Sequence, residues 1–223
     1  MPQTLAFIHT SALTIPIFGG LAQQQMPDVE VFHMVDESLL KNTLAAGHLE
    51  KTTIRRLSAM VESAGEAGAD AVMVACSSIG PAVDVARELV DFPVVRVDEA
   101  MAEQAVMTGA RIGVAATLAS TLNPTCALIR ARAQAAELER TIVERLCEGA
   151  FEAVKAGDPE THDRIVGEGL AELAQQCDVI VLAQASMARV ADTLPADKRT
   201  VPILSSPASG VAQARQALES LRG

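Results

Sequence analysis

Cys76 is the residue in this sequence best suited to carry out chemistry. It follows the hydrophobic run Ala71–Ala75, which is typical of a buried strand, and Ser77 and Ser78 come directly after it. A cysteine acts as a base or nucleophile only as the thiolate, so its ordinary pKa of about 8.5 has to be lowered. We expect the N-terminal amides of a helix beginning near Pro81 to lower it and, with the two serine hydroxyls, to bind a substrate carboxylate. The alternative is a buried, inert cysteine, which is common for free thiols.

A second segment repeats this pattern with a different residue at the key position. Val179–Ala188 matches Ala71–Gly80, and Gln184 stands 108 residues after Cys76 at the equivalent place. Glutamine cannot take up or release a proton, but its amide donates and accepts hydrogen bonds. We expect Gln184 and the nearby Ser186 to bind a carboxylate or carbonyl oxygen. The alternative is a polar strand end that only packs.

Hydroxyl side chains follow the first predicted strand of each repeat. Thr10 and Thr117 are separated by 107 residues, and further hydroxyls stand beside them at Ser11, Ser120 and Thr121. Such hydroxyls bind a carboxylate without adding charge, which suits a small dicarboxylic or amino acid as substrate. Serine and threonine also cap helix N-termini, and the two roles can coexist.

The other polar residues are weaker candidates. His9 stands at a strand end, but we expect it to be a structural histidine satisfied by its neighbours. Asp36–Glu37 and Asp98–Glu99 are expected to cap helices or line the rim of the site rather than act as acid/base pairs. Packing explains the remaining cysteines, which are Cys126, Cys147 and Cys177.

Short apolar runs alternate with segments of helical periodicity, which indicates parallel sheets covered by helices on both faces. The predicted strands are Leu5–His9, Val29–His33, Ala71–Ala75, Val94–Val97, Ile112–Ala115, Val179–Leu182 and Val201–Leu204. The predicted helices are Leu44–Ala67, Val83–Leu89, Ala100–Met107, Pro124–Ala136, Glu137–Ala156, Glu160–Gln176 and Gly210–Leu221. A turn is predicted at Leu194–Lys198.

The repeat predicts an α/β fold of two pseudosymmetric lobes, each a short, mostly parallel sheet flanked by helices. Ligands bind outside the carboxyl ends of parallel strands, so the active site is expected in the cleft between the lobes. The first lobe is predicted to span residues 1–97 and 207–223, and the second residues 98–206. The helix that follows the last strand of each lobe is expected to pack on the opposite lobe.

Composition limits the classes of partner. The 223 residues carry a net charge of −10 and only 2% aromatic residues, which argues against nucleic acid and anionic membrane surfaces. No apolar run reaches the roughly 18 residues of a membrane span, and no signal-peptide pattern is present, so we expect a cytoplasmic protein. Metal-ligand spacings and nucleotide-binding glycine patterns are missing from the sequence, so no metal or organic cofactor is predicted.

The strand-end motifs resemble those of the aspartate/glutamate racemase superfamily. The resemblance rests on Ala6–Thr10, on Ile112–Thr117, on Cys76 with the two serines after it, and on Leu182–Ala188. The superfamily includes aspartate, glutamate and hydantoin racemases, maleate isomerase and arylmalonate decarboxylase. The resemblance implies two pseudosymmetric lobes with the site between them, catalysis without pyridoxal phosphate or another cofactor and, by analogy, a homodimer.

In racemases of this superfamily, two cysteines on opposite faces of the substrate's α-carbon exchange protons, so the configuration inverts. Cys76 matches the first of these cysteines, and Gln184 occupies the place of the second. The resemblance further implies that four hydroxyls bind the substrate carboxylate, those of Ser77, Ser78, Thr117 and Ser120.

The sequence therefore predicts a racemase-family enzyme that transfers a proton at the carbon next to a carboxylate or carbonyl of a small acid. Cys76 would be its single catalytic thiol, and racemisation would need another group, such as His9 or a water, on the second face. One alternative is a decarboxylase of malonate-type acids, because the superfamily's decarboxylase also has one cysteine, on the other strand motif. The other alternative is a carboxylate-binding protein without catalysis.

Overall fold

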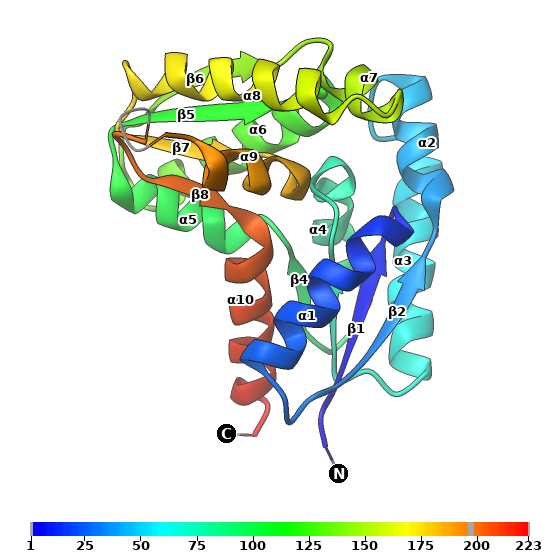
Figure 1. Ribbon diagram of the computed structural model, residues 1–223. Helices are drawn as coiled ribbons and strands as arrows, with labels where there is room; N and C mark the ends of the chain where they lie inside the picture. The colour runs from blue at the N-terminus through cyan, green and yellow to red at the C-terminus, as the bar shows by residue number, and fades with distance from the viewer. Residues whose placement is uncertain (1, 196–198, 223) are drawn as a thin grey trace. The chain divides into compact units, whose positions relative to one another are not determined.

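The computed structural model describes residues 2–195 and 199–222. The chain divides into two compact units, Met1–Glu99 with Pro207–Gly223, and Ala100–Ser206. Each unit contains one four-stranded sheet whose strands are all parallel (Figure 1). The turn predicted at residues 194–198 lies partly outside the described residues.

The sheet of the first unit has the strand order β2-β1-β3-β4. Its strands are β1 (Thr4–His9), β2 (Glu30–Val35), β3 (Ala71–Val74) and β4 (Val94–Arg96). Successive side chains of a strand point to opposite faces, so Leu5 and Phe7 lie in one core and Ala6 and Ile8 in the other. The first core is closed by α1 (Ile15–Gln25) and α10 (Ser206–Ser220), and the second by α2 (Glu37–Ala46), α3 (Lys51–Glu66) and α4 (Pro81–Arg87).

The sheet of the second unit repeats this arrangement, with the order β6-β5-β7-β8. Its strands are β5 (Arg111–Ala116), β6 (Thr141–Leu146), β7 (Val179–Leu182) and β8 (Ile203–Ser205). One face packs against α5 (Glu99–Thr108) and α6 (Ala119–Ala135). The other face packs against α7 (Ala150–Lys155), α8 (Pro159–Ala174) and α9 (Ala188–Thr193).

The two sheets confirm the predicted α/β class and the internal repeat. Strands β1 and β5 start at residues 4 and 111, and strands β3 and β7 at residues 71 and 179, which are the spacings expected from the matching motifs. The helix after β4 contributes Met101 and Ala105 to the core of the second unit. The helix after β8 contributes Val211 and Ala214 to the core of the first unit, so both closing helices pack on the opposite sheet, as predicted. A site between the lobes stays a prediction.

Two predicted helices were wrong, and one helix was missed. The segment 137–156, predicted as one helix, contains strand β6, an edge strand with no buried residue, so its sequence lacks the continuous apolar run of the central strands. The helix predicted over 44–67 is two helices, because Gly47 ends α2 in the left-handed conformation at φ 72°. Helix α1 was missed because Gly19 and Gly20 obscure its pattern, although Phe18 and Ala22 are buried one turn apart.

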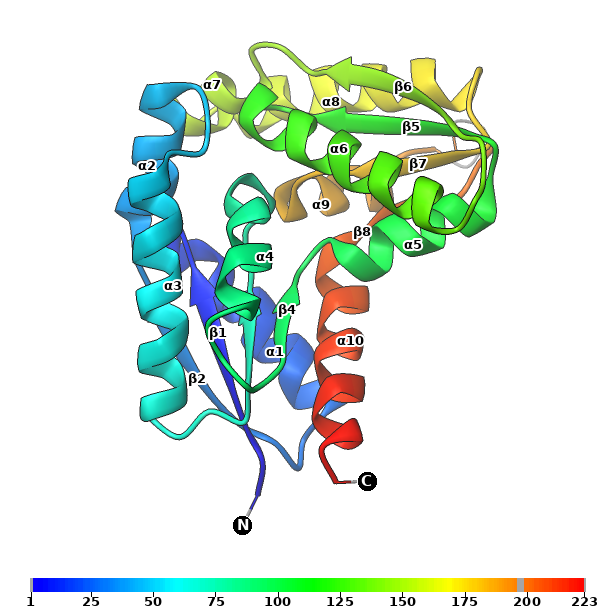
Figure 2. The same ribbon diagram turned by 180° about the vertical axis from the view of Figure 1, so that it is seen from behind.

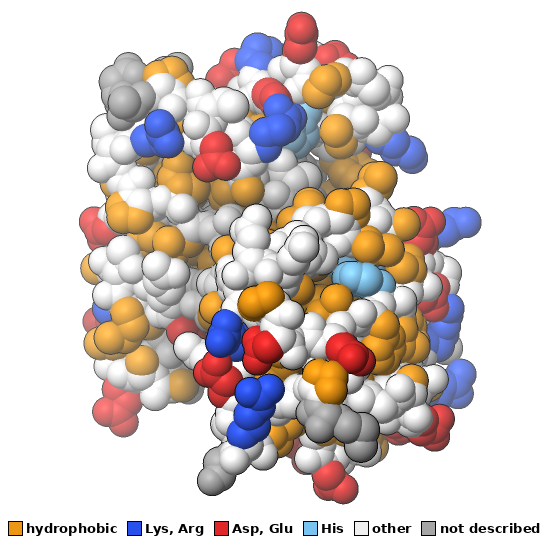
Figure 3. All heavy atoms as spheres, turned by 60° about the horizontal axis from the view of Figure 1, so that its bottom comes forward, with side chains coloured by type: hydrophobic (Ala, Val, Ile, Leu, Met, Phe, Trp, Pro, Cys, Tyr) orange, Lys and Arg blue, Asp and Glu red, His pale blue; other side chains and the backbone are white. Residues whose placement is uncertain are grey.

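The surface offers two observations on partners. Within residues 2–195 and 199–222, no helix combines the length and the apolar character needed to cross a membrane. Basic and acidic side chains are interspersed over the face drawn in Figure 3. The expectation that nucleic acid is not a partner stays a prediction.

Candidate functional site

The first unit brings Thr10 and Cys76 together. Strands β1 and β3 are parallel neighbours, with Ile8 opposite Val74, so the residues after them reach the same edge of the sheet. The Thr10 side chain hydrogen-bonds the Cys76 thiol. Thr10 is buried and Cys76 is partly exposed, whereas the other three cysteines are buried.

The serines near Cys76 have different environments. Ser77 and Ser78 are 7% and 5% exposed and form a 3-10 turn, η2 (Ser77–Ile79), directly after the cysteine. Ser11 is partly exposed and caps the turn η1 (Ala12–Thr14) by accepting a hydrogen bond from the Leu13 amide. The capping interpretation therefore holds for Ser11, while Ser77 and Ser78 line the loop that carries the thiol.

The pKa of Cys76 differs from the expectation. Burial raises the pKa of the thiol above its ordinary value, and the charge of Asp98 raises it further. The Thr10 hydroxyl and the amides of Ile79 and Ser78 act in the opposite direction. The prediction of a lowered pKa was wrong because η2 separates Cys76 from α4 and because burial outweighs the local donors. The thiol is consequently protonated at neutral pH.

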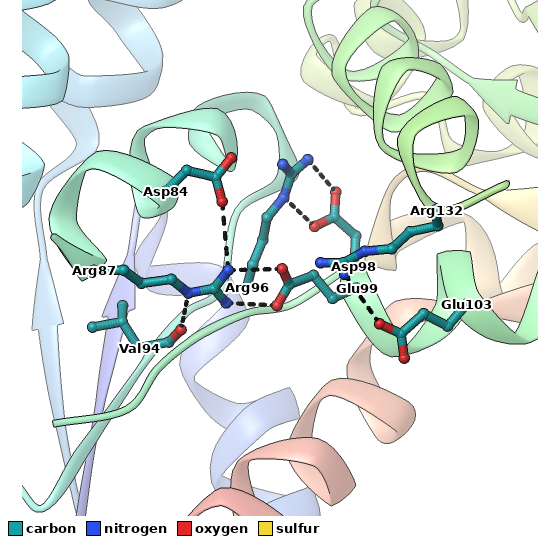
Figure 4. A network of polar contacts seen from close by, with 8 residues as sticks. All are labelled: Asp84, Arg87, Val94, Arg96, Asp98, Glu99, Glu103 and Arg132. Atoms are coloured by element: carbon teal, nitrogen blue, oxygen red, sulfur yellow. Dashed lines mark hydrogen bonds and ion pairs between the residues drawn. The ribbon is translucent and has the colours of Figure 1, made fainter. Parts of the chain in front are cut away.

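A buried ion pair supports the Cys76 loop. Arg96 and Asp98 are 3% and 0% exposed and form two hydrogen bonds of 2.7 and 3.1 Å, drawn in Figure 4. A Cβ atom at Gly80 would overlap the Arg96 guanidinium, so the loop that follows Cys76 lies directly on this pair. Sequence reasoning missed Arg96. The signal was the Arg-x-Asp spacing at a strand end, which places both side chains on one side of the chain.

A second ion pair lies next to the first. Arg87 donates to both carboxylate oxygens of Glu99, at 2.9 and 2.6 Å, and its Nε donates to the Val94 carbonyl at 2.7 Å (Figure 4). Asp98 and Glu99 are thus paired with arginines, and the expectation that they cap a helix or line a rim was incomplete. Asp36, in contrast, caps α2 by accepting from the Ser38 amide, as predicted.

His9 is held on both ring nitrogens. Thr14 Oγ1 donates to the Ser11 carbonyl at 2.8 Å, so it accepts from His9 Nδ1 at 2.7 Å, and His9 Nε2 accepts from His33 Nδ1 at 2.9 Å. His9 is 0% exposed, and its pKa falls to about 4 because of burial and the neighbouring His33. His9 is therefore a neutral structural residue at pH 7.

The second unit brings Thr117 and Gln184 together. Strands β5 and β7 are parallel neighbours, with Ala115 opposite Leu182. Gln184 Oε1 accepts from the Thr117 amide at 2.6 Å and from Thr117 Oγ1 at 2.9 Å. Both donors of Thr117 are thus used within the protein. The Gln184 Nε2 group has no partner among the described residues and can donate to a ligand.

The other predicted residues of the second unit are more dispersed. Ser120, in the first turn of α6, has a buried Oγ with no hydrogen-bond partner among residues 2–195 and 199–222. Thr121 is buried, and Ser186 is exposed in the turn η3 (Ala185–Met187). The residue before α6 is Leu118, which cannot cap with its side chain, so capping does not explain Ser120.

Thr117 also lines a depression of about 410 Å³ at the carboxyl ends of β5 and β6. Leu118, Leu146 and Gly149 form part of its wall, and its charged residues are Glu148 and Glu152. A ligand group in this depression would therefore be a hydrogen-bond donor or a cation rather than a carboxylate.

The remaining cysteines are enclosed in the cores. Burial raises the pKa of Cys126 to about 12 and that of Cys147 to about 11, and it also raises the pKa of Cys177. Their packing roles are those predicted. In the part of the chain that the structure describes, no group of three or more His, Cys, Asp or Glu side chains is arranged to hold a metal ion.

Comparisons with known proteins connect this arrangement to a family. The sequence profile of the Asp/Glu/Hydantoin racemase family matches residues 10–214. No curated protein matches the chain by sequence.

Solved structures share the fold at low sequence identity. Glutamate racemase from Francisella tularensis in complex with D-glutamate superposes with a TM-score of 0.76 at 14% identity, over 99% of this chain and 82% of that one. Allantoin racemase from Klebsiella pneumoniae gives 0.71 at 18% identity, over 98% and 88%. Aspartate racemase from Picrophilus torridus gives 0.70 at 12% identity, over 96% and 94%.

Proposed function

The chain belongs to the Asp/Glu/hydantoin racemase family, and on that premise we propose that it is a cofactor-independent enzyme with Cys76 as its single catalytic thiol. It would transfer a proton at the carbon next to a carboxylate or carbonyl of a small acid. The observation that carries the proposal is the pair of equivalent strand ends, one bearing a thiol beside Thr10 and the other a carboxamide bound to Thr117.

The environment of Cys76 suits a thiol that donates a proton and then becomes protonated again. Because the pKa of the thiol is raised, the group is protonated before reaction and can deliver its proton to a carbanion or enediolate. The thiolate formed in that step is stabilised by the Thr10 hydroxyl and the amides of Ser78 and Ile79. In a decarboxylation, loss of CO₂ supplies the carbanion, and the thiolate left after protonation takes a proton from solvent. In α-proton exchange, the thiolate form of Cys76 first removes the α-proton, and the thiol so formed returns a solvent-derived proton to the same face.

The environment of Gln184 suits binding rather than proton transfer. Its oxygen is occupied by Thr117, so the Nε2 donor is the group offered to a substrate carboxylate or carbonyl. We propose that the unpartnered Ser120 hydroxyl adds a further donor. A substrate that also bears an amine, amide or ureido group would place that donor in the acidic depression beside Thr117.

Proton exchange in D₂O tests the proposal. The protein is incubated with each enantiomer of aspartate and glutamate and with 5-substituted hydantoins, and loss of the α-proton signal is followed by NMR together with chiral chromatography. We expect exchange with retained configuration, because only one titrating group serves the α-carbon. Inversion that keeps pace with exchange would overturn the single-thiol proposal.

Decarboxylation is the second candidate function, favoured by the resting protonation of Cys76. A thiol that is already protonated can protonate the carbanion left when a substituted malonate loses CO₂. Release of CO₂ from substituted malonates with one product enantiomer in excess would select this activity over exchange of amino acids. Tight binding of these acids without exchange or CO₂ release would instead indicate a binding protein.

Replacement of Gln184 by cysteine tests the role of the second strand end. The resemblance implies that the residue at position 184 meets the second face of the α-carbon, so Gln184→Cys would supply the missing acid. We expect racemisation of an exchanging substrate to rise by about 10²-fold or more, the usual size of one general acid. Ser63→Cys, at an exposed serine of α3 outside the predicted site, is the control and leaves racemisation unchanged.

A further inference from the structure

Gly80 is required by the space around it rather than by its backbone conformation. Its dihedral angles, φ −49° and ψ −42°, are those of a right-handed helix, which any residue adopts. A Cβ atom at this position would overlap Nε, Cζ and Nη2 of Arg96. A glycine therefore stands here because the Arg96 guanidinium packs directly against the backbone of the Cys76 loop, residues 76–80.

The guanidinium cannot move aside to make room. Arg96 is 3% exposed, and its Nε and Nη2 donate to the two carboxylate oxygens of Asp98 at 2.7 and 3.1 Å. Asp98 is 0% exposed, so water does not replace these hydrogen bonds when they break. Arg96 also lies opposite Val74 in the parallel pair of β3 and β4, two residues before Cys76. The sheet and Asp98 together fix the position of the guanidinium.

The Cys76 loop is short and enclosed, so a shift at one end reaches the other. The Gly80 amide donates to the Ser77 carbonyl at 3.1 Å, and Ile79 is fully buried in the core of the first unit. Helix α4 follows Gly80 directly and packs beside β4, as Figure 2 shows. The amides of Ser78 and Ile79 hydrogen-bond the Cys76 thiol. A shift of Gly80 would therefore move these two donors away from the sulfur.

We propose that Arg96 is a positioning residue for Cys76, which acts through Gly80 to hold the two amides of η2 beside the sulfur. This inference rests on the proposed function, in which the Cys76 thiolate forms during proton transfer. Asp98 orients the guanidinium. Arg96 acts by its volume and position rather than by its charge, since it is not among the groups that shift the pKa of Cys76.

The second unit supports this reading of Gly80. The equivalent residue is Ala188, whose dihedral angles of φ −56° and ψ −42° are close to those of Gly80, so the backbone of this turn accepts a side chain. The residue equivalent to Arg96 is Ser205. The glycine thus occurs in the unit that has the arginine, and it is replaced by alanine in the unit where a short side chain stands in place of the arginine.

Replacement of Gly80 by alanine tests the proposal through the pH profile of iodoacetamide labelling, followed at the Cys76 peptide by mass spectrometry. We expect labelling near pH 8 to slow by about fivefold or more in Gly80→Ala, because the thiolate is the reacting form and loses hydrogen bonds to its charge. Gly20→Ala on α1 is the matched control, since nothing lies within 4 Å of a Cβ atom there, and its profile stays in place.

Removal of the guanidinium separates positioning from a general loss of structure. Arg96→Ser/Asp98→Asn removes both charges of the buried pair, so neither is left unpaired. In that background the Cβ atom has room, so Gly80→Ala is expected to leave the labelling profile where the background places it. A shift of the same size in both backgrounds would overturn the proposal, and so would an unchanged profile in Gly80→Ala alone.

A second comparison leaves Gly80 in place and applies even if Gly80→Ala does not fold. Arg96→Ser/Asp98→Asn and Asp98→Asn both lack the charge of Asp98, but only the double variant lacks the guanidinium. We expect slower labelling in the double variant by a similar factor, and equal labelling would overturn the proposal. Labelling needs no substrate, so a wild type without α-proton exchange would contradict the proposed function and leave the role of Arg96 to be decided by these profiles.

Discussion

The two units place equivalent residues on the same frame and differ in what those residues can do. In each unit, a threonine after the first strand hydrogen-bonds the residue after the third, Thr10 to Cys76 and Thr117 to Gln184. Cys76 can titrate, whereas Gln184 cannot. Gln184 accepts hydrogen bonds from both the amide and the hydroxyl of Thr117. The fold therefore fixes the position of these residues, and the side chain at the end of the third strand decides the chemistry.

The contrast extends beneath the loops. The buried Arg96 leaves no room for a side chain at position 80, which is glycine. In the second unit, the equivalent residues are Ala188 at the position of Gly80 and Ser205 at the position of Arg96. Strand β1 ends at His9, which is buried in a hydrogen-bonded chain, where β5 ends at Ala116. At these equivalent positions the first unit thus has an arginine and a histidine where the second has a serine and an alanine.

The largest expected effect comes from comparing the loss of Cys76 with the loss of Gln184. Cys76→Ala removes the only titrating side chain of either pair, so we expect α-proton exchange to fall by about 10²–10⁴-fold. Gln184→Ala removes a binding group, so it raises KM and leaves most of the exchange rate at saturation. Exchange rates at several substrate concentrations distinguish these effects. Equal losses of kcat in both variants would contradict the asymmetry.

Breaking the buried pair of the first unit comes next. Asp98→Asn leaves the Arg96 charge uncompensated in the core, which costs about 3–5 kcal/mol of unfolding free energy. The charge of Asp98 raises the pKa of Cys76, so its removal lowers that pKa, and thiol alkylation accelerates at a lower pH. Urea unfolding and the pH profile of iodoacetamide labelling measure the two effects.

The control for this variant is Glu99→Gln, which breaks the neighbouring pair with Arg87. Glu99 is not among the groups that shift the pKa of Cys76, so the labelling profile should stay in place while stability falls. A labelling profile that moves equally in both variants would show that loss of structure, rather than the charge of Asp98, controls the thiol.

These contrasts show which parts of the site could be read from the sequence. The motifs around Cys76 and Gln184 predicted two parallel sheets with polar residues at the carboxyl ends of their strands, because strand ends and sheet edges follow from local pattern and repeat. The contacts of Thr10 with Cys76 and of Thr117 with Gln184 were not predicted. The pKa of Cys76 could not be predicted, since it depends on burial by residues far apart in the chain. Helix α6 was predicted to start at Pro124 but begins at Ala119, so Ser120 lies in the first turn of the helix rather than before it.

Acid sensitivity is expected to arise in the first unit. The folded pKa of His9 is about 4, below the ordinary 6.5, so the unfolded chain binds more protons between these values. Stability is therefore complete above pH 6.5, falls as the pH drops, and levels off below pH 4 after a loss of about 3 kcal/mol. His9→Gln, which keeps the hydrogen bonds to Thr14 and His33, should flatten this dependence in urea titrations.

The matched control is His48→Gln, because His48 is exposed on the surface of the same unit. That variant should keep the slope of the parent protein between pH 6.5 and pH 4. If the slope survives in His9→Gln, the acid sensitivity belongs to other groups, and the hydrogen-bonded chain through His9 is not its source.

The smallest effect tests whether Thr117 holds Gln184 in place. Thr117→Val removes the hydroxyl donor at 2.9 Å but keeps the backbone donor at 2.6 Å, so the carboxamide oxygen stays satisfied and stability falls by only about 1 kcal/mol.

Thr10→Val removes instead the hydroxyl that stabilises the Cys76 thiolate, so the pKa of that thiol rises and exchange slows. Thr117→Val should weaken substrate binding without moving the pH profile of exchange, because Gln184 does not titrate. A shifted pH profile of exchange in Thr117→Val would mean that both threonines influence the proton-transfer step. It would contradict the assignment of proton transfer to Cys76 and of binding to Gln184.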